Sequence, residues 1–223
     1  MSSSTTSKRT SATPDGQGRQ RLLLAIGGLV ALAFIVGIAV LSTGERGSRV
    51  TVDDIAGEPS ITGEPLAIGG QDIPNDPEVG SQAPVVTGAD FDGTPVTIGE
   101  PGTPQLLMFM ASWCPACQQE LREVSPWLNE GGLRDDVDLV AVSTLHRDNA
   151  QPWPPDEWFA SEDFTAPILV DDADGSVADA YGLSATPFWV ALDAQGRVVA
   201  RVAGMLPLEQ IEALADAVAG GPA

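Results

Sequence analysis

The 223-residue chain has only two cysteines and one histidine, so few side chains are available for a metal site. A structural zinc ion needs about four ligands, usually two cysteine pairs or one pair with histidines. Here Cys114 and Cys117 form the one pair, and the histidine is His146. Covalent haem attachment needs a histidine directly after the second cysteine, where this chain has Gln118. The sequence therefore argues against both sites, and we expect no metal and no other cofactor.

Positive charge is also scarce. The chain carries 11 basic and 31 acidic residues, a formal net charge of −20, and it has no lysine after residue 41. A surface this acidic repels nucleic acid and anionic lipid at long range. We therefore expect no nucleic-acid partner, and we interpret the acidity as a source of solubility rather than as a sign of a cationic partner.

One long apolar run stands near the N terminus. Residues 22–41 contain no charged residue and, as a helix, would span roughly 30 Å, the thickness of the hydrocarbon core of a membrane. The preceding residues 1–21 are polar and hold four basic side chains, which predicts a cytoplasmic tail and an extracytoplasmic remainder. A cleaved signal peptide is the alternative, but its apolar region usually has about 7–15 residues. The sequence thus predicts a transmembrane anchor at 22–41.

After the apolar run, the composition changes twice. Residues 42–79 are rich in glycine and proline and poor in large apolar side chains, which predicts a flexible linker. From residue 80 to 221, short apolar runs alternate with helical patterns, which is typical of one α/β domain. In chain order we expect a hairpin, a strand, a helix, a strand, a short helix, an extended piece, a helix, two strands and a helix, within 83–98, 104–112, 114–128, 136–144, 155–163, 166–172, 175–183, 186–204 and 207–220.

The two cysteines stand two residues apart, directly after an apolar strand and at the start of a helical pattern. A structural disulfide at this spacing would close a very short loop, where the stabilising gain is least. At a helix N terminus, unpaired amides and the helix dipole favour an anion, so Cys114 is expected to ionise readily. Pro115 fits the first helical turn, where its missing amide costs little. We therefore favour a redox-active pair, with Cys114 as nucleophile and Cys117 as resolving thiol.

The sequence from Trp113 to Cys117, Trp-Cys-Pro-Ala-Cys, resembles the motif of the thioredoxin superfamily. A second landmark agrees, because Thr186-Pro187 precedes an apolar strand, where such proteins keep a cis-proline facing the disulfide. The N-terminal hairpin and the anchor resemble the membrane-tethered TlpA/ResA branch. The resemblance implies a thioredoxin-like fold, in which a central mixed sheet is flanked by helices, with an N-terminal hairpin extension. It also implies that Trp113, Pro115, Thr186 and Pro187 bind the partner.

Glu120 is a candidate for exchanging a proton with Cys117. Soluble thioredoxins carry a buried acid in the strand beneath the cysteines, and the matching residue here is Met108. Glu120 lies at the edge of the apolar stripe of the helix, where partial burial would raise its pKa toward that of a general base. In the TlpA/ResA branch a glutamate at this spacing is functional. The branch usually has proline where this chain has Arg122, and Pro126 is expected to kink or end the helix.

Together these features predict a membrane-tethered, extracytoplasmic thiol-disulfide oxidoreductase that uses a Cys114–Cys117 disulfide. Its partners would be protein thiols and disulfides and an unidentified electron donor or acceptor, with the membrane contacted through residues 22–41. The resemblance favours a reductant, with cytochrome c maturation as one role. A disulfide-forming oxidase is the closest alternative, and a redox-silent tethered binding module is another.

Overall fold

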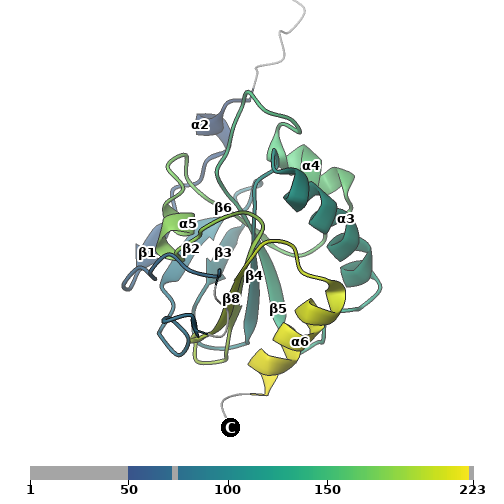
Figure 1. Ribbon diagram of the computed structural model, residues 1–223. Coiled ribbons are helices and arrows are strands. Elements are labelled where there is room, and N and C mark those ends of the chain that lie inside the picture. The colour runs from purple at the N-terminus through teal and green to yellow at the C-terminus, as the bar shows by residue number, and fades with distance from the viewer. Residues whose placement is uncertain (1–49, 72–74, 221–223) are drawn as a thin grey trace, which may run out of the picture. The chain divides into compact units, whose positions relative to one another are not determined.

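The computed structural model describes residues 50–71 and 75–220 (Figure 1). Its largest sheet has five strands in the order β6-β5-β4-β7-β8. The central strand β4 is parallel to β5 and antiparallel to β7, so the sheet is mixed, as the resemblance implied. The strands of this sheet are β4 (Gln105–Met110), β5 (Asp138–Ser143), β6 (Ile168–Val170), β7 (Phe188–Leu192) and β8 (Val198–Ala203).

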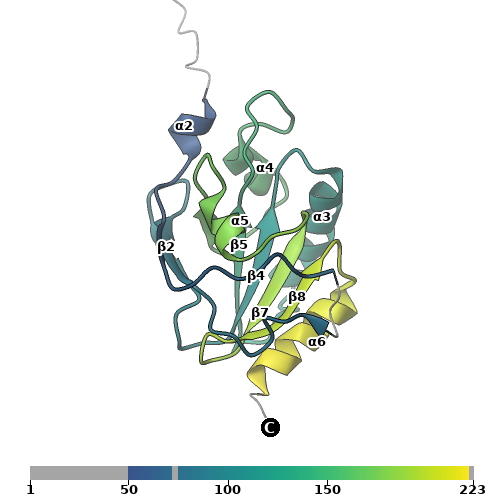
Figure 2. The same ribbon diagram turned by 60° about the vertical axis from the view of Figure 1, so that its left-hand side comes forward.

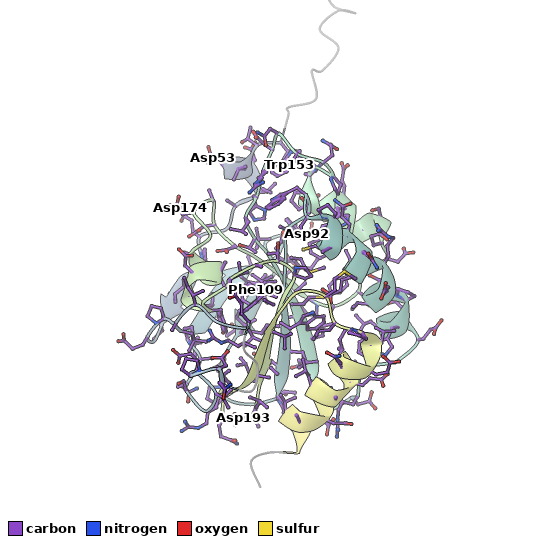
Figure 3. All side chains as sticks on the ribbon, in the orientation of Figure 1. Asp53, Asp92, Phe109, Trp153, Asp174 and Asp193 are labelled. Carbon is purple, nitrogen blue, oxygen red and sulfur yellow. The ribbon has the colours of Figure 1, made fainter. Side chains whose placement is uncertain are left out.

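Every residue of β4 is buried, because both faces of the sheet are covered. On one face, Leu106, Met108 and Met110 pack into a core with α3 (Pro115–Asn129), α4 (Pro155–Ser161) and α6 (Leu208–Ala219). On the other face, Leu107 and Phe109 pack with the N-terminal strands and α5 (Ser176–Ala180). Figures 1 and 2 show α3 and α6 on one side of the sheet and α5 on the other, and Figure 3 shows Phe109 in the interior. This alternation is the period of two that a strand imposes on its side chains.

The expected N-terminal hairpin is present as β2 (Val85–Ala89) and β3 (Pro95–Ile98), which pair antiparallel. A third strand, β1 (Ser60–Thr62), adds to β2 and makes a separate three-stranded sheet. A short helix, α2 (Val52–Ile55), precedes it. The sequence did not predict β1 or α2.

The prediction of a flexible linker over 42–79 is wrong for its described part. We call residues 64–71 and 75–80 the strap. The amide of Leu66 donates to Ala180 O, and the amide of Ala203 donates to Gly70 O. Arg201, in β8, forms an ion pair with Asp76, and both side chains are almost completely buried. The strap is therefore part of the domain, because its polar groups find their partners far along the chain.

Two further expectations concern helices. Pro126 does not end α3, which continues to Asn129. Within residues 50–71 and 75–220, no helix is long and apolar enough to cross a membrane. The predicted cytoplasmic tail 1–21 and anchor 22–41 lie outside the described residues.

Candidate active site

Cys114 is the N-cap residue of α3, four residues after the last residue of β4. Its amide donates to Ala111 O at 3.0 Å, which closes the turn between strand and helix. Its sulfur accepts the amide of Cys117 at 3.4 Å, and Pro115 occupies the first helical turn. The helix start thus presents an unpaired backbone donor to the sulfur, as expected for an N-cap side chain.

The environment of Cys114 favours its thiolate. Its side chain is mostly buried, with 8% of the residue exposed. Burial alone would raise the pKa of Cys114, but hydrogen bonds from the amide and thiol of Cys117 outweigh it, and the pKa lies below its usual value. A thiolate at a helix N terminus is the nucleophilic form of cysteine.

Cys117 has the opposite environment. It is completely buried, and burial raises its pKa far above the usual value. Both cysteines are free thiols in this structure, and the sulfur of Cys114 lies against the amide of Cys117. The pair therefore combines one partly accessible, acidic thiol with one inaccessible, protonated thiol.

The loop before β7 meets the cysteines. The peptide bond between Thr186 and Pro187 is cis, which confirms the expectation from the sequence. The sulfur of Cys114 lies 3.4 Å from Thr186 O, a contact between residues far apart in the chain. Pro187 is buried, and its carbonyl accepts the amide of Gly204 at 2.8 Å. Thr186 itself is partly exposed beside the reactive sulfur.

Glu120 is more deeply buried than the sequence indicated, with 1% of the residue exposed. Its Oε1 accepts the indole N–H of Trp189 at 2.9 Å and the amide of Leu206 at 2.8 Å. Its Oε2 is buried and has no hydrogen-bond partner among the described residues. Burial raises the pKa of Glu120 to about 7, although both hydrogen bonds oppose the shift. These bonds go to Trp189 and Leu206 and not to either cysteine.

Trp113 and Pro115 flank the cysteine pair. Pro115 is exposed and Trp113 is half-buried. The indole N–H of Trp113 donates to Leu145 O at 2.6 Å, and the guanidinium carbon of Arg147 lies 3.4 Å from the centre of a Trp113 ring. The sequence carries no signal that Leu145, Arg147 and Leu206 are neighbours of the site.

Two thiols can be oxidised to a disulfide and the disulfide reduced again, so Cys114 and Cys117 can carry two electrons between them. Within the described parts of the chain, no three His, Cys, Asp or Glu side chains gather in a way that could hold a metal ion. The chemistry that this geometry supports is thiol-disulfide exchange.

Comparisons with known proteins match this picture. The model of the Redoxin family matches residues 78–217. The methylamine utilization protein MauD of Methylobacillus flagellatus is 28% identical over 141 residues, which cover 60% of this chain and 62% of MauD, less than two thirds of its length. Sporulation thiol-disulfide oxidoreductase A of Bacillus subtilis is 26% identical over 122 residues, covering 55% of this chain and 72% of that protein.

Solved structures share the fold. A thiol:disulfide interchange protein from Bacteroides sp. aligns with a TM-score of 0.50 at 20% identity, covering 64% of this chain and 91% of that chain. A thioredoxin-family thiol:disulfide interchange protein from Chlorobium tepidum TLS also aligns with a TM-score of 0.50, at 16% identity, covering 61% and 94%.

Proposed function

The chain belongs to the redoxin family, among the TlpA/ResA-type members of the thioredoxin superfamily, and from this premise we propose that it is a thiol-disulfide oxidoreductase acting on protein partners outside the cytoplasmic membrane. The observation that carries the proposal is the asymmetry of its two thiols. Cys114 has a lowered pKa at a helix N terminus, and Cys117 is buried with a raised pKa. This division suits an attacking thiol and a resolving thiol.

In the first step, the thiolate of Cys114 attacks one sulfur of a partner disulfide. A bond forms between Cys114 Sγ and that sulfur, the partner disulfide breaks, and the other partner sulfur leaves as a thiolate. Trp113 and Pro115 would contact the partner on one side of the mixed disulfide. Thr186, whose carbonyl oxygen lies against Cys114, and the adjacent Pro187 would contact it on the other side, with the backbone of Thr186 pairing with an extended partner segment.

In the second step, Cys117 attacks Cys114 Sγ, releases the partner's second thiol and leaves a Cys114–Cys117 disulfide. Two electrons have then passed from the chain to the partner. Cys117 must first lose its proton, because its pKa is raised by burial. Glu120 stands one helical turn further on, and side chains three residues apart on a helix are neighbours. We assign it the role of proton acceptor: Oε2 can take the proton while Oε1 keeps both of its hydrogen bonds.

The direction of electron flow and the location are further parts of the proposal. We infer that residues 22–41 anchor the chain and that the domain acts as a reductant, with cytochrome c maturation as one role. The support is the resemblance to the TlpA/ResA branch and the apolar run in the sequence. An oxidase that forms disulfides would run the same two steps in reverse.

Trapping tests the exchange mechanism. The Cys117→Ala variant keeps the attacking thiol but lacks the resolving thiol, so we expect it to accumulate mixed disulfides with partner proteins in the cell. The measurement is non-reducing electrophoresis, followed by mass spectrometry of the captured proteins. The matched control is Cys114→Ala, which should capture nothing, because the buried Cys117 cannot reach a partner. Capture by neither variant would contradict the mechanism and favour a redox-silent binding module, whereas equal capture by both would overturn the assignment of Cys114 as the attacking thiol.

The reduction potential of the cysteine pair tests the direction. A reductant should have a potential of about −270 mV, and an oxidant one of about −120 mV. We expect the first value, measured by equilibrating the full chain with glutathione or dithiothreitol buffers and counting free thiols. A potential near the oxidant value would rule out the reductive role and leave the exchange mechanism intact.

A further inference from the structure

The loop after β5 places a positive charge beside the reactive cysteine. Arg147 is exposed, and its guanidinium carbon lies 3.4 Å from the ring centre of Trp113, the residue that precedes Cys114. This is the geometry of a cation–π contact. A guanidinium stacked on a ring keeps its N–H donors in its own plane, where they can still bind a carboxylate.

The loop that carries Arg147 is held at several points. The amide of Thr144 donates to Met110 O at 2.9 Å, at the end of the strand that leads to the cysteines. The hydroxyl of Thr144 donates to the buried carboxylate of Asp171 at 2.6 Å. Leu145 has a φ of 51°, in the left-handed region, and its carbonyl accepts the indole N–H of Trp113. Arg147 is thus presented by a positioned loop, which lowers the entropy lost when it binds a partner.

Within the described part of the chain, no ion pair neutralises the charge of Arg147. Five arginines lie in the described part of the chain, and the ion pairs found there do not include Arg147. The other four have partners within the domain: Arg122 with Glu162, Arg134 with Asp136 and Asp216, Arg197 with the carbonyl of Gly80, and Arg201 with Asp76. The cation beside the active site is therefore free of an intramolecular acid among the described residues, on a chain whose formal charge is −20.

We propose that Arg147 is a specificity residue, which selects partner segments that carry an acidic side chain next to the reacting cysteine. The inference rests on the proposed thiol-disulfide exchange and names a chemical feature of its protein substrates. A partner whose sulfur has reached Cys114 brings its flanking residues past Trp113, within reach of the guanidinium. At physiological ionic strength the Debye length is about 8 Å, so distant acids of the domain are screened and the contact with Arg147 decides the local preference.

The test uses three synthetic peptides with one cysteine each, oxidised to homodimeric disulfides. The residues on both sides of the cysteine are Glu, Gln or Lys in a Gly-Ser background. The reduced full-length chain attacks each disulfide through Cys114 and resolves through Cys117, so two electrons pass to each peptide pair. Second-order rate constants at about 0.15 M ionic strength give a Glu-to-Gln rate ratio. We expect Arg147→Gln to lower this ratio by about two- to fivefold, the range of an exposed ion pair.

Matched variants separate recognition from other effects. Arg147→Lys keeps the charge, so it should lower the Glu-to-Gln rate ratio less than Arg147→Gln does. Arg197→Gln removes one positive charge from the turn between β7 and β8, at the opposite end of β7 from Pro187, and should leave the ratio unchanged. Because both glutamine variants change the net charge equally, a general electrostatic effect would affect both alike.

Two results would overturn the specificity role of Arg147. If Arg147→Gln slows all three peptides by the same factor, Arg147 only supports Trp113 and the specificity role is wrong. A ratio in the unaltered chain that does not fall when the ionic strength is raised would also overturn the inference, and this readout needs no substitution. If the unaltered chain and Arg147→Gln reduce the peptides with the same Glu-to-Gln rate ratio, only the specificity role of Arg147 is wrong. If the unaltered chain reduces none of the peptides, the proposed thiol-disulfide exchange is wrong as well.

Discussion

At the scale of the residue, Glu120 shows how burial can bring the pKa of a carboxyl close to neutral pH. Its carboxyl is buried in the core on the α3 side of the sheet, where ionisation costs solvation energy. Two hydrogen bonds to Oε1 offset part of that cost, and Oε2 has no described partner. The result is a pKa of about 7, which suits a group that takes up and releases protons under physiological conditions.

This shifted pKa makes the stability of the domain depend on pH. Between pH 4.5, the model-compound value for glutamate, and about 7, the folded chain keeps the proton on Glu120 and the unfolded chain releases it. The unfolded state then binds fewer protons, so the free energy of unfolding falls as the pH rises through this window. Above pH 7 this contribution is constant. The fall amounts to about 3 kcal/mol.

We predict that Glu120→Gln removes this fall, because glutamine stays neutral. Urea unfolding at pH 5, 6, 7 and 8 should show the unaltered chain losing about 2.5 kcal/mol more than the variant, because the series begins above the lower end of the window. Glu123→Gln is the control, since Glu123 is exposed on the same helix, and it should keep the fall. Parallel pH profiles for the unaltered chain and Glu120→Gln would show that Glu120 is already ionised at pH 5.

At the scale of the element, the strap is held by charge rather than by apolar packing alone. Asp76 and Arg201 are 125 residues apart, and their side chains are 1% and 0% exposed. Burial by itself raises the pKa of Asp76, but the hydrogen bonds and charge of Arg201 outweigh it and keep the pKa below its usual value. Arg201 also donates to Ala67 O and Tyr181 O. One guanidinium therefore joins the strap, β8 and the end of α5.

We predict that Asp76→Asn destabilises the domain by about 3–5 kcal/mol at pH 7, because it leaves the charge of Arg201 buried without a counter-ion. The measurement is urea unfolding of the purified chain. Asp136→Asn is the control: it removes the partner of an exposed arginine, Arg134, and should destabilise the domain far less, because solvent screens an exposed ion pair. Similar, small losses in both variants would mean that the buried ion pair contributes little to the folded state.

The strap also shows where prediction from the sequence stops. The strands β4 and β5 were predictable because a strand covered on both faces needs a continuous apolar run. The strap has no such run, and its glycines Gly69 and Gly70 let the backbone approach other elements closely. A Cβ on Gly69 would lie 2.0 Å from Nη2 of Arg201, so only glycine fits beside the guanidinium. The same composition also describes a flexible linker, and only contacts with distant residues such as Ala180, Arg201 and Ala203 distinguish the strap from one.

At the scale of the whole molecule, the cysteine pair and the cis-proline of the candidate site were predictable from the sequence, but the residues around them were not. The spacing of Cys114 and Cys117 after an apolar strand, and the proline before β7, are local patterns, and the structure brings them together. The full burial of Glu120 depends on Trp189 and Leu206, which come from other elements. The contact of Arg147 with Trp113 likewise depends on how the loop after β5 folds back. Such contacts have no signal in a single sequence.

The domain begins earlier in the chain than the sequence predicts, because α2, β1 and the strap belong to it. If residues 22–41 lie in the membrane, as proposed, only the eight residues 42–49 separate the anchor from the unit that begins at Val50. A fully extended chain of that length spans about 29 Å, whereas 38 free residues, 42–79, would span about 137 Å. On that proposal, residues that a linker would use for reach are used for folding instead, so partner proteins near the membrane surface would exchange disulfides more readily than those far from it.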